Sequence, residues 1–407
     1  MISVAEAEQI IREHRRDFGV EHLPFTAAAG RVLAEPVVAD RDLPPYDRVA
    51  MDGIAIRYAD YLAGCRQFGI AAVQAAGQPP PDQLAPNTCI EIMTGAALPP
   101  RADTVVPYEH LHIANGVANI AFEPVVQGKN IHRQGRDKRL GETVLAPGCL
   151  IGAAELSMLA SVGHTQVAVR KLPRVAILSS GDELVEPAQT PSPYQIRRSN
   201  SYAIQAVLQG LGVPAELLHL PESLELTRRI LEDCLPRFDV LLLSGGVSMG
   251  KFDVVPQALE DCGVRRLFHK VRQRPGKPFW LGVFGEKGVV FAFPGNPVST
   301  FLCLHRYFVP WFKSSLHFPE QPVARAVLEK NIRFEPNLQY FVQVKLRRDE
   351  QTRLLASPFE GHGSGDFANL LDTQAFLELP AERSDFEAGE IFPVWPYSSL
   401  FTFHASL

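Results

Sequence analysis

The chain has 407 residues, of which 46% are hydrophobic and 21% are charged, and its formal net charge is −5. This length exceeds what one hydrophobic core normally supports, so we expect two to four structural units. The near-average charge argues against a general nucleic-acid or membrane binder, and any basic site must therefore be local.

The amino terminus and the cysteines both indicate a cytoplasmic protein. The chain begins MISVAEAEQIIREHRRDF, which is amphipathic and charged where a signal peptide would be continuously apolar. No uninterrupted apolar run of about 18 residues follows, so we expect no membrane segment. The six cysteines form no CxxC pair, which argues against a thiolate zinc site and against a disulfide framework.

The first part of the chain combines an arm with a β-rich insertion. Residues 2–16 have helical periodicity, and prolines then break up the extended segments that follow. Short β-like runs next alternate with Gly/Pro turns, which is typical of a compact β domain. A helix over residues 153–162 returns the chain to the arm. We expect an arm from residues 1–45 and 146–170 and an inserted β-rich domain over residues 46–145.

From Arg174 onward the pattern changes to apolar strands that alternate with helices of about ten to fifteen residues. This alternation is typical of a parallel, doubly wound α/β sheet, whose ligands bind beyond the carboxyl ends of the strands. Turn residues follow three of the strands, so three loops should converge on one pocket. We expect the α/β domain over residues 171–318 and a small β domain or barrel over residues 319–407.

The loops after these strands have the composition of an anion site. In SGGVSMGKFD, Gly245 and Gly246 allow close approach of the backbone, and Ser244 and Ser248 add hydroxyl donors. In FPGNPVST a Pro/Gly turn precedes a helix whose amino terminus can bind an anion through backbone N–H groups. Ordinary capped turns are the alternative interpretation. Taken together, the loops predict a pocket for phosphate-like anions.

A basic loop and two carboxylates complete this pattern. The run HKVRQRPGKP places Lys270, Arg274 and Lys277 close together on a segment stiffened by proline, where they would neutralise phosphate or an oxyanion. Glu183 follows the first strand end and either caps backbone N–H groups or pairs with Asp253. As a pair they could bind Mg²⁺, which takes one or two carboxylates beside phosphates.

Ordered motifs along most of the chain resemble the molybdopterin molybdenumtransferase family, to which the E domain of gephyrin is similar. They are, in chain order, YDRVAMDG, IMTGAALP, VVPYE, SSGDEL, SNSYAI, SGGVSMGKFD, RPGKP and FPGNPVS. The resemblance implies an elongated subunit of four parts: an N-terminal arm, an inserted β-rich domain, a doubly wound α/β molybdopterin-binding domain and a C-terminal β-barrel-like domain. It also implies a homodimer in which the insert of one subunit closes the α/β site of the other.

The resemblance further implies an activity and its residues. Members of the family use Mg²⁺ to cleave the phosphoanhydride of adenylylated molybdopterin, and with molybdate they yield molybdenum cofactor and AMP. Asp52, Thr94, Glu183 and Asp253 match the catalytic positions, and Glu183 and Asp253 would hold the metal; by physics alone, Asp52 and Thr94 lie in ordinary turns. Other proteins of molybdenum-cofactor biosynthesis are further expected partners. The expected substrate-binding residues are Ser180, Gly181, Asn200, Ser244, Gly245, Gly246, Ser248, Lys270, Arg274, Lys277, Pro294, Gly295, Asn296, Pro297 and Ser364.

Several positions depart from the family pattern, and four of them bear on whether the protein inserts the metal. Arg198 and Lys251 stand where acidic residues are frequent, and Asn337 and Val342 align with arginines of the C-terminal domain. These departures leave two alternatives open. The first is a catalytically weak or inactive paralogue that binds molybdopterin or a related phosphorylated ligand as a carrier or scaffold. The second is an enzyme that acts on a different nucleotide conjugate.

Overall fold

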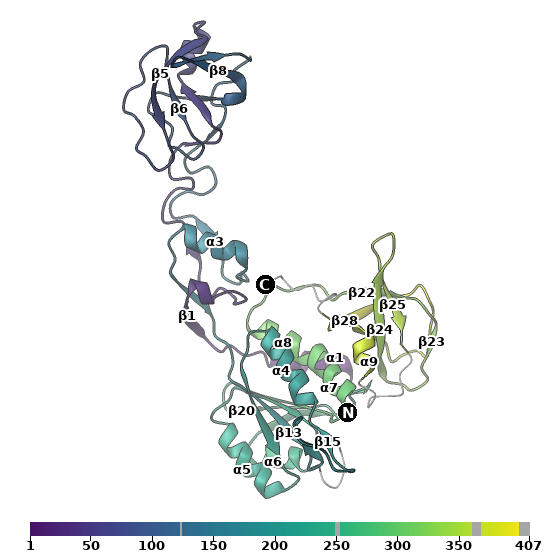
Figure 1. Cartoon of the computed structure of the whole chain (residues 1–407). Helices are drawn as coiled ribbons and strands as arrows, with labels where there is room; N and C mark the ends of the chain where they lie inside the picture. The colour runs from purple at the N-terminus through teal and green to yellow at the C-terminus, as the bar shows by residue number, and fades with distance from the viewer. Residues whose placement is uncertain (123, 249–252, 360–367, 399–407) are drawn as a thin grey trace. The chain divides into compact units, whose positions relative to one another are not determined.

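The computed structural model describes residues 1–122, 124–248, 253–359 and 368–398 (Figure 1). The chain forms two compact units. The larger unit consists of Met1–Ala34, Pro147–Leu156 and Gln166–Leu407, and the smaller unit consists of Glu35–Ala146 and Ser157–Thr165. No helix in the described ranges is both long enough and apolar enough to span a bilayer.

The chain leaves and re-enters the larger unit at adjacent points. Strand β1 (Val20–Pro24) pairs antiparallel with β12 (Gln166–Arg170). Beyond this ladder, the N–H of Leu33 donates to the carbonyl of Cys149 and the N–H of Gly148 donates to the carbonyl of Leu33, both at 2.8 Å. The helix α3 (Ala153–Ser161) lies between these contacts and β12 in the sequence.

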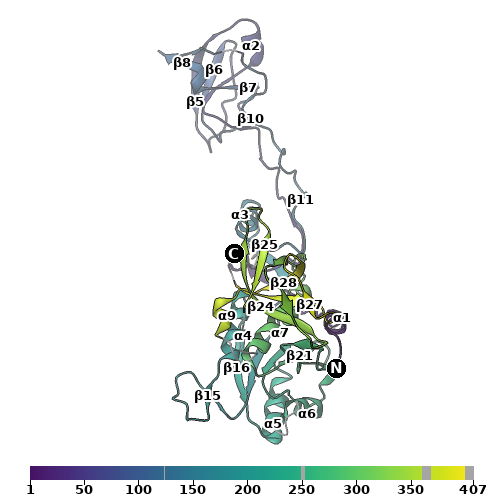
Figure 2. The ribbon, with the colours of Figure 1, turned by 90° about the vertical axis from the view of Figure 1, so that its right-hand side faces the viewer.

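The smaller unit contains a β-sheet, of which Figure 2 labels β5, β6, β7 and β8. Its six strands lie in the order β7-β4-β6-β5-β9-β8. Ile54 and Ile56 pack in one apolar cluster and Ala55 packs in another, because successive side chains of a strand point to opposite faces. Both faces are therefore buried at this strand. The elements are β4 (Gly53–Ile56), α2 (Tyr58–Leu62), β5 (Gln67–Gln74), β6 (Thr88–Ile92), β7 (Thr104–Pro107), β8 (Leu111–Ala114) and β9 (Val117–Ile120), with the short pairs β2 (Val37–Val38) and β11 (Thr143–Leu145), and β3 (Arg48–Val49) and β10 (Ile131–His132).

The larger unit is built on a second six-stranded sheet with the order β16-β13-β17-β21-β20-β18. The first four strands are parallel, which confirms the predicted doubly wound α/β fold, and β20 pairs antiparallel with both β21 and β18. The order reverses between β13 and β17, and such a switch point is where ligands of these sheets bind. The strands are β13 (Val175–Ser180), β16 (Ala215–Leu220), β17 (Val240–Ser244), β18 (Arg265–His269), β20 (Trp280–Phe284) and β21 (Gly288–Phe293).

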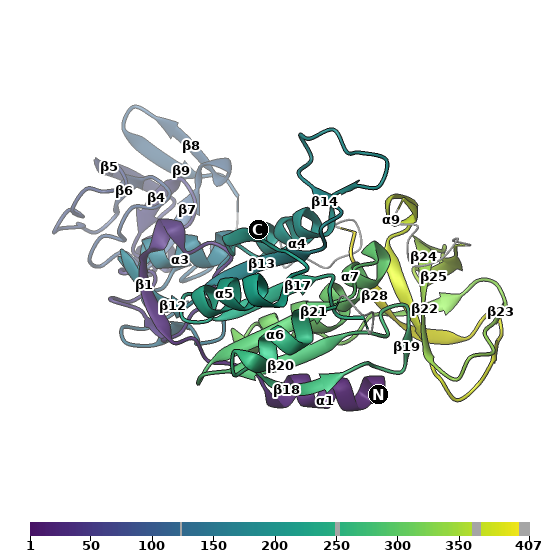
Figure 3. The same ribbon diagram turned by 90° about the horizontal axis from the view of Figure 1, so that it is seen from below.

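Helices cover both faces of this sheet (Figures 1 and 3). Ile177 packs in the core on the side of α1, α4, α7 and α8, and Leu178 packs in the core on the side of α5 and α6. The helical segment that follows β21 is interrupted by a π-helical turn, because Pro310 has no N–H to donate to the preceding turn. The elements are α1 (Val4–Glu13), α4 (Asn200–Gly210), α5 (Leu224–Cys234), α6 (Val255–Asp261), α7 (Pro297–Cys303), the π-helical turn η3 (Leu304–Phe308) and α8 (Val309–Ser315).

A closed barrel of five strands forms the C-terminal part of the larger unit, as the sequence predicted. The strands run in the order β24-β25-β22-β28-β26, and β26 pairs again with β24. Strand β19 (Gln273–Arg274), from the basic loop, adds to β24 in parallel and so joins the barrel to the α/β sheet. The elements are β22 (Arg325–Leu328), β23 (Ile332–Arg333), β24 (Gln339–Arg348), β25 (Leu354–Pro358), α9 (Asn369–Asp372), β26 (Ala375–Leu379), β27 (Asp385–Phe386) and β28 (Ile391–Pro396).

Candidate functional site

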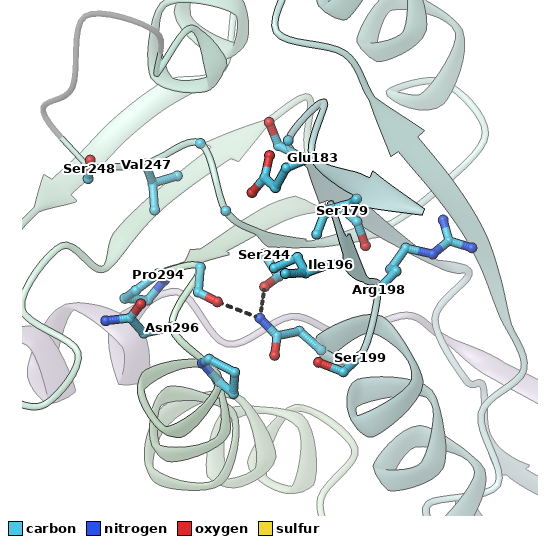
Figure 4. Close-up of a pocket in the computed structure, with 18 of the residues that line it drawn as sticks. Ser179, Glu183, Ile196, Arg198, Ser199, Ser244, Val247, Ser248, Pro294 and Asn296 are labelled. Carbon is cyan, nitrogen blue, oxygen red and sulfur yellow. Dashed lines mark hydrogen bonds between the residues drawn. The ribbon is translucent and has the colours of Figure 1, made fainter. Parts of the chain in front are cut away.

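A cavity of about 430 Å³ opens at the switch point of the α/β sheet (Figure 4). Its walls come from the loops after β13, β17 and β21, from the start of α4, and from the segment that contains the short strands β14 (Leu184–Val185) and β15 (Ile196–Arg197). All of the lining residues belong to the larger unit. They are Ser179, Ser180, Gly181, Glu183, Leu184, Ile196, Arg197, Arg198, Ser199, Asn200, Glu222, Ser244, Gly245, Gly246, Val247, Ser248, Asp253, Pro278, Pro294, Gly295, Asn296 and Pro297.

The glycine turn after β17 lies directly against the loop after β13. Gly245 has a φ of +93°, and a Cβ atom there would lie 2.5 Å from the carbonyl oxygen of Ser180. Gly246 has a φ of +68°, and its Cβ would lie 2.6 Å from the Val255 side chain. Both the backbone conformation and the close contacts therefore require glycine at these two positions.

Asn200, at the start of α4, ties together two of the loops that line the cavity. Its Nδ2 group donates to Ser244 Oγ at 2.8 Å and to the carbonyl of Gly295 at 2.7 Å, as the dashed lines in Figure 4 show. Thr300, in the first turn of α7, donates its hydroxyl to the carbonyl of Pro294 at 2.5 Å. The loops after β17 and β21 are therefore held at the amino terminus of α4.

One side of the cavity is acidic. Glu183 and Asp253 both line it, and the Ser248 hydroxyl donates to the Asp253 carboxylate. Glu222, at the end of the neighbouring strand β16, also lines the cavity. Burial, together with the negative charges of Asp182, Glu183 and Asp253, raises the pKa of Glu222. Within the described residues, no three His, Cys, Asp or Glu side chains form a ready-made metal cluster.

A second cavity of about 240 Å³ adjoins the first and has basic walls. Arg274 and Lys277 of the basic loop line it together with Ser299 of α7. The two cavities share three lining residues, which are Pro278, Pro294 and Asn296. The carboxylates Glu183, Glu222 and Asp253 therefore line only the first cavity, and Arg274 and Lys277 line only the second.

His269 links the glycine loop to the edge of the sheet. Its Nε2–H donates to the carbonyl of Val247 at 2.9 Å. Burial lowers the pKa of His269, and the positive charges of Lys270 and Arg266 act in the same direction. The next residue, Lys270, has a φ of +73° and is absent from the linings of both cavities.

Asp52 and Thr94 lie in the smaller unit, where they contact each other. The N–H and the hydroxyl of Thr94 donate to Asp52 Oδ1 at 2.6 and 2.7 Å, and these hydrogen bonds lower the pKa of Asp52. Both side chains are exposed. Two further positions singled out in the sequence, Lys251 and Ser364, lie outside the described residues.

The remaining departures from the family pattern have identifiable surroundings. Arg198 lies in the wall of the first cavity, is 9% exposed and forms an ion pair of 2.6 Å with Glu186. Asn337 Oδ1 accepts a hydrogen bond of 2.6 Å from Arg272 Nη2, so a guanidinium group from the basic loop occupies this corner of the barrel. Val342 is 5% exposed and packs inside the barrel.

Sequence reasoning missed several lining residues, of which Glu222 and Gln273 bear most on the chemistry. Glu222 follows an edge strand in the unremarkable run LPES, where only its position at a strand end could have indicated it. Gln273 lies between two arginines of the basic loop, in which only the cations were singled out, and its side chain is fully buried. No sequence signal distinguishes these two from ordinary loop residues.

Comparison with known families places the doubly wound sheet, with the cavity at its switch point, and the C-terminal barrel in a molybdopterin-binding class of protein. Residues 2–163 match the MoeA N-terminal region (domain I and II), residues 176–314 match the probable molybdopterin binding domain, and residues 325–397 match the MoeA C-terminal region (domain IV).

Similarity to individual proteins extends over nearly the whole chain. A molybdopterin molybdenumtransferase of Synechocystis sp. is 39% identical over 98% of this chain and 100% of its own length. One from Synechococcus elongatus is 32% identical over 91% and 93% of the two chains. The crystal structure of the molybdopterin biosynthesis moeA protein from Pyrococcus horikoshii OT3 superposes with a TM-score of 0.81 at 26% identity, covering 98% and 100% of the two chains. The chain belongs to the molybdopterin molybdenumtransferase family.

Proposed function

We propose that this protein inserts molybdate into adenylylated molybdopterin and releases AMP, yielding molybdenum cofactor. The observation that carries the proposal is the adjoining pair of cavities, one walled by glycine turns and carboxylates and the other by cations, with Pro278, Pro294 and Asn296 common to both. The transfer brings a phosphoanhydride and an oxyanion together, and two joined anion sites suit that requirement.

The pterin phosphate and its anhydride would occupy the first cavity. Gly245 and Gly246 leave room for the backbone to approach a phosphate, and Ser244 is held toward the cavity by Asn200. Molybdate would occupy the second cavity, where Arg274 and Lys277 supply fixed positive charge and Ser299 a hydroxyl. Fixed donors stabilise the charge that develops as the bond between the two phosphoryl groups breaks.

The carboxylates on the acidic side fit a magnesium ion. Burial and the negative charges of Asp182, Glu183 and Asp253 raise the pKa of Glu222. Mg²⁺ near phosphates takes one or two carboxylates and keeps several waters, so a cluster of three protein ligands is not required. We assign Glu183 and Asp253 as its ligands, with Glu222 beside them. When bound, the ion would neutralise charge on the anhydride oxygens.

We further propose a cytoplasmic homodimer in which Asp52 and Thr94 of one subunit complete the site of its partner. Asp52 is exposed, and two hydrogen bonds from Thr94 keep its carboxylate ionised. An exposed, ionised carboxylate suits a residue that contributes to the site of a second subunit. The four-part division into arm, insert, α/β domain and barrel, and contact with other proteins of the pathway, belong to the same proposal.

The direct test measures AMP release from adenylylated molybdopterin in the presence of Mg²⁺ and molybdate. Glu183→Gln and Asp253→Asn should each slow release by at least about tenfold, which corresponds to about 1.4 kcal/mol of transition-state stabilisation. Glu232→Gln is the matched control, because this carboxylate is 56% exposed on α5 and lies 3.8 Å from its partner Arg228. An intact wild-type protein that binds molybdopterin but releases no AMP would reject the proposal in favour of a carrier.

A further inference from the structure

A buried amide lies beneath the turn that carries the cations of the second cavity. Gln273 has 0% exposure and immediately precedes Arg274. Its Nε2 group donates to the carbonyl of Gly276 at 3.3 Å and contacts Cys303 Sγ at 3.7 Å, and its Oε1 accepts from the Tyr307 hydroxyl. Both ends of the amide therefore have partners, as a buried polar group requires.

The turn is pressed directly against this amide. Gly276 has a φ of +86°, and a Cβ atom there would lie 2.6 Å from Gln273 Nε2 and 2.9 Å from Cys303 Sγ. The backbone of the turn thus contacts Gln273 without an intervening side chain. Arg274 lies two residues before Gly276 and Lys277 follows it at once, so both cations depend on where this backbone lies.

The other side of the amide is anchored in the helix that borders the cavity. Ser299 lines the cavity from the first turn of α7, and Cys303 and Tyr307 follow it at intervals of four residues. Tyr307 is 2% exposed and its ring stacks on Phe279 with centroids 5.0 Å apart. Burial raises the pKa of Tyr307 well above its ordinary range, so its hydroxyl remains a donor.

Hydrogen bonds, in addition to packing, therefore determine where the turn lies. An apolar residue of similar volume at position 273 would fill the same space but would not fix the direction of the Gly276 carbonyl. Moving the turn would take the Gly276 carbonyl away from Gln273 Nε2 and leave that buried N–H without its oxygen acceptor, which is disfavoured. The amide therefore resists movement of the cations that flank Gly276.

We propose that Gln273 is a positioning residue for the oxyanion, acting through the turn that carries Arg274 and Lys277. This inference rests on the proposed function, because it assigns molybdate to the second cavity. It adds a chain of contacts from α7 through Tyr307 and Gln273 to the basic turn. It predicts that affinity for molybdate depends on a buried amide and a buried hydroxyl, while binding of the pterin in the first cavity does not.

The test uses the full-length protein with Gln273→Met, which keeps the approximate side-chain shape, and with Tyr307→Phe, which removes one hydroxyl. In the AMP-release assay, each variant should raise the KM for molybdate by about tenfold or more, because misplacing groups by about 1 Å costs on this scale. The kcat at saturating molybdate and the Kd for molybdopterin should change by less than about twofold, because the first cavity keeps its geometry. Tyr61→Phe is the control, because Tyr61 in the smaller unit is 7% exposed and accepts a hydrogen bond from the Val125 N–H at 3.2 Å.

The outcomes separate this inference from the proposed function. A wild-type molybdate KM in both folded variants would overturn the positioning role even if AMP release is normal. If the wild-type protein releases no AMP, direct calorimetric binding of molybdate decides: weaker binding by the variants supports the role of Gln273, and equal binding overturns it. If Gln273→Met does not fold, Tyr307→Phe gives the decision alone.

Discussion

Arg306 and Glu378 form an ion pair in which the side chains are only 5% and 9% exposed, with Nε 3.1 Å from Oε2. Glu378 also accepts from Trp395 Nε1 at 2.6 Å and from Gln339 Nε2 at 2.9 Å. Nη2 of the same guanidinium group lies 2.8 Å from Oε2 of Glu8 in α1. The pair therefore joins the π-helical turn, the barrel and the N-terminal helix.

Arg306→Met should lower the free energy of unfolding by about 3–5 kcal/mol, because it leaves a buried carboxylate without its countercharge. Adding Glu378→Gln should recover part of the loss, since the buried group is then neutral. Urea denaturation gives the free energy of unfolding of the single and the double variant. A double variant that is no more stable than Arg306→Met would contradict the predicted recovery. The exposed pair Arg229–Glu225, at 68% and 75% exposure, is the control, and Arg229→Met should cost less than about 1 kcal/mol.

Gly245→Ala should damage both stability and ligand binding. The new methyl group would lie 2.5 Å from the Ser180 carbonyl oxygen at a φ of +93°, so the anion turn must move. We expect about 1–3 kcal/mol of lost stability from the strained backbone and weaker binding of molybdopterin. Gly212→Ala is matched to it, with a φ of +73° and no atom within 4 Å of the added Cβ. Gly212→Ala should lose stability but keep the wild-type Kd for molybdopterin in calorimetry. If both variants change the Kd equally, the close contact with Ser180 does not matter for binding.

Asn200→Ala should loosen the loops around the first cavity. It leaves the carbonyl of Gly295 and the hydroxyl of Ser244 without a donor that now lies 2.7 and 2.8 Å away, at an expected cost of about 1–3 kcal/mol. Thermal denaturation and calorimetric binding of molybdopterin check this. Asn119→Ala, which removes an exposed 3.3 Å bond to the carbonyl of His112, should change neither.

Glu222→Gln should stabilise the ligand-free protein near neutral pH. Burial and the charges of Asp182, Glu183 and Asp253 raise the pKa of Glu222 above its ordinary value of 4.5. Ionising it therefore costs more in the folded than in the unfolded chain, so stability is lost as pH rises through the raised pKa and is retained below the ordinary value. The variant should have the higher Tm at about pH 7 without Mg²⁺, and the two curves should converge toward about pH 4. A lower Tm for the variant at neutral pH would contradict this interpretation.

The strands that carry the site could be predicted because their signals are local. The apolar runs ending at Ser180 and Ser244 are too short for helices and end in glycine turns, and the structure has β13 and β17 there. The paired strands β18 and β20 were missed, since the runs RRLFH and WLGVF carry no hairpin turn between them. Their pairing spans the basic loop and depends on contacts distant in sequence.

The site was predicted where loops contribute glycines and hydroxyls and missed where burial decides the role. Asn200 and Ser244 belong to motifs whose neighbours are distinctive, and the structure brings them into contact. Gln273 lies in a charged run whose cations alone were singled out, and the packing of α7 beneath it makes the amide buried. The direction of a side chain in an irregular loop follows from such packing, which a single sequence does not encode locally.

The mutual hydrogen bonds between Leu33 and the Cys149–Gly148 segment have a consequence for how the protein assembles. Because the two ends of the excursion are held together by hydrogen bonds of 2.8 Å, a short turn could join them, and closing a short loop costs less conformational entropy than closing residues 35–146. Replacing the whole excursion with a tight two-residue reverse turn should leave a truncated chain that still unfolds cooperatively. Such a minimal scaffold would keep the anion cavity while dispensing with Asp52.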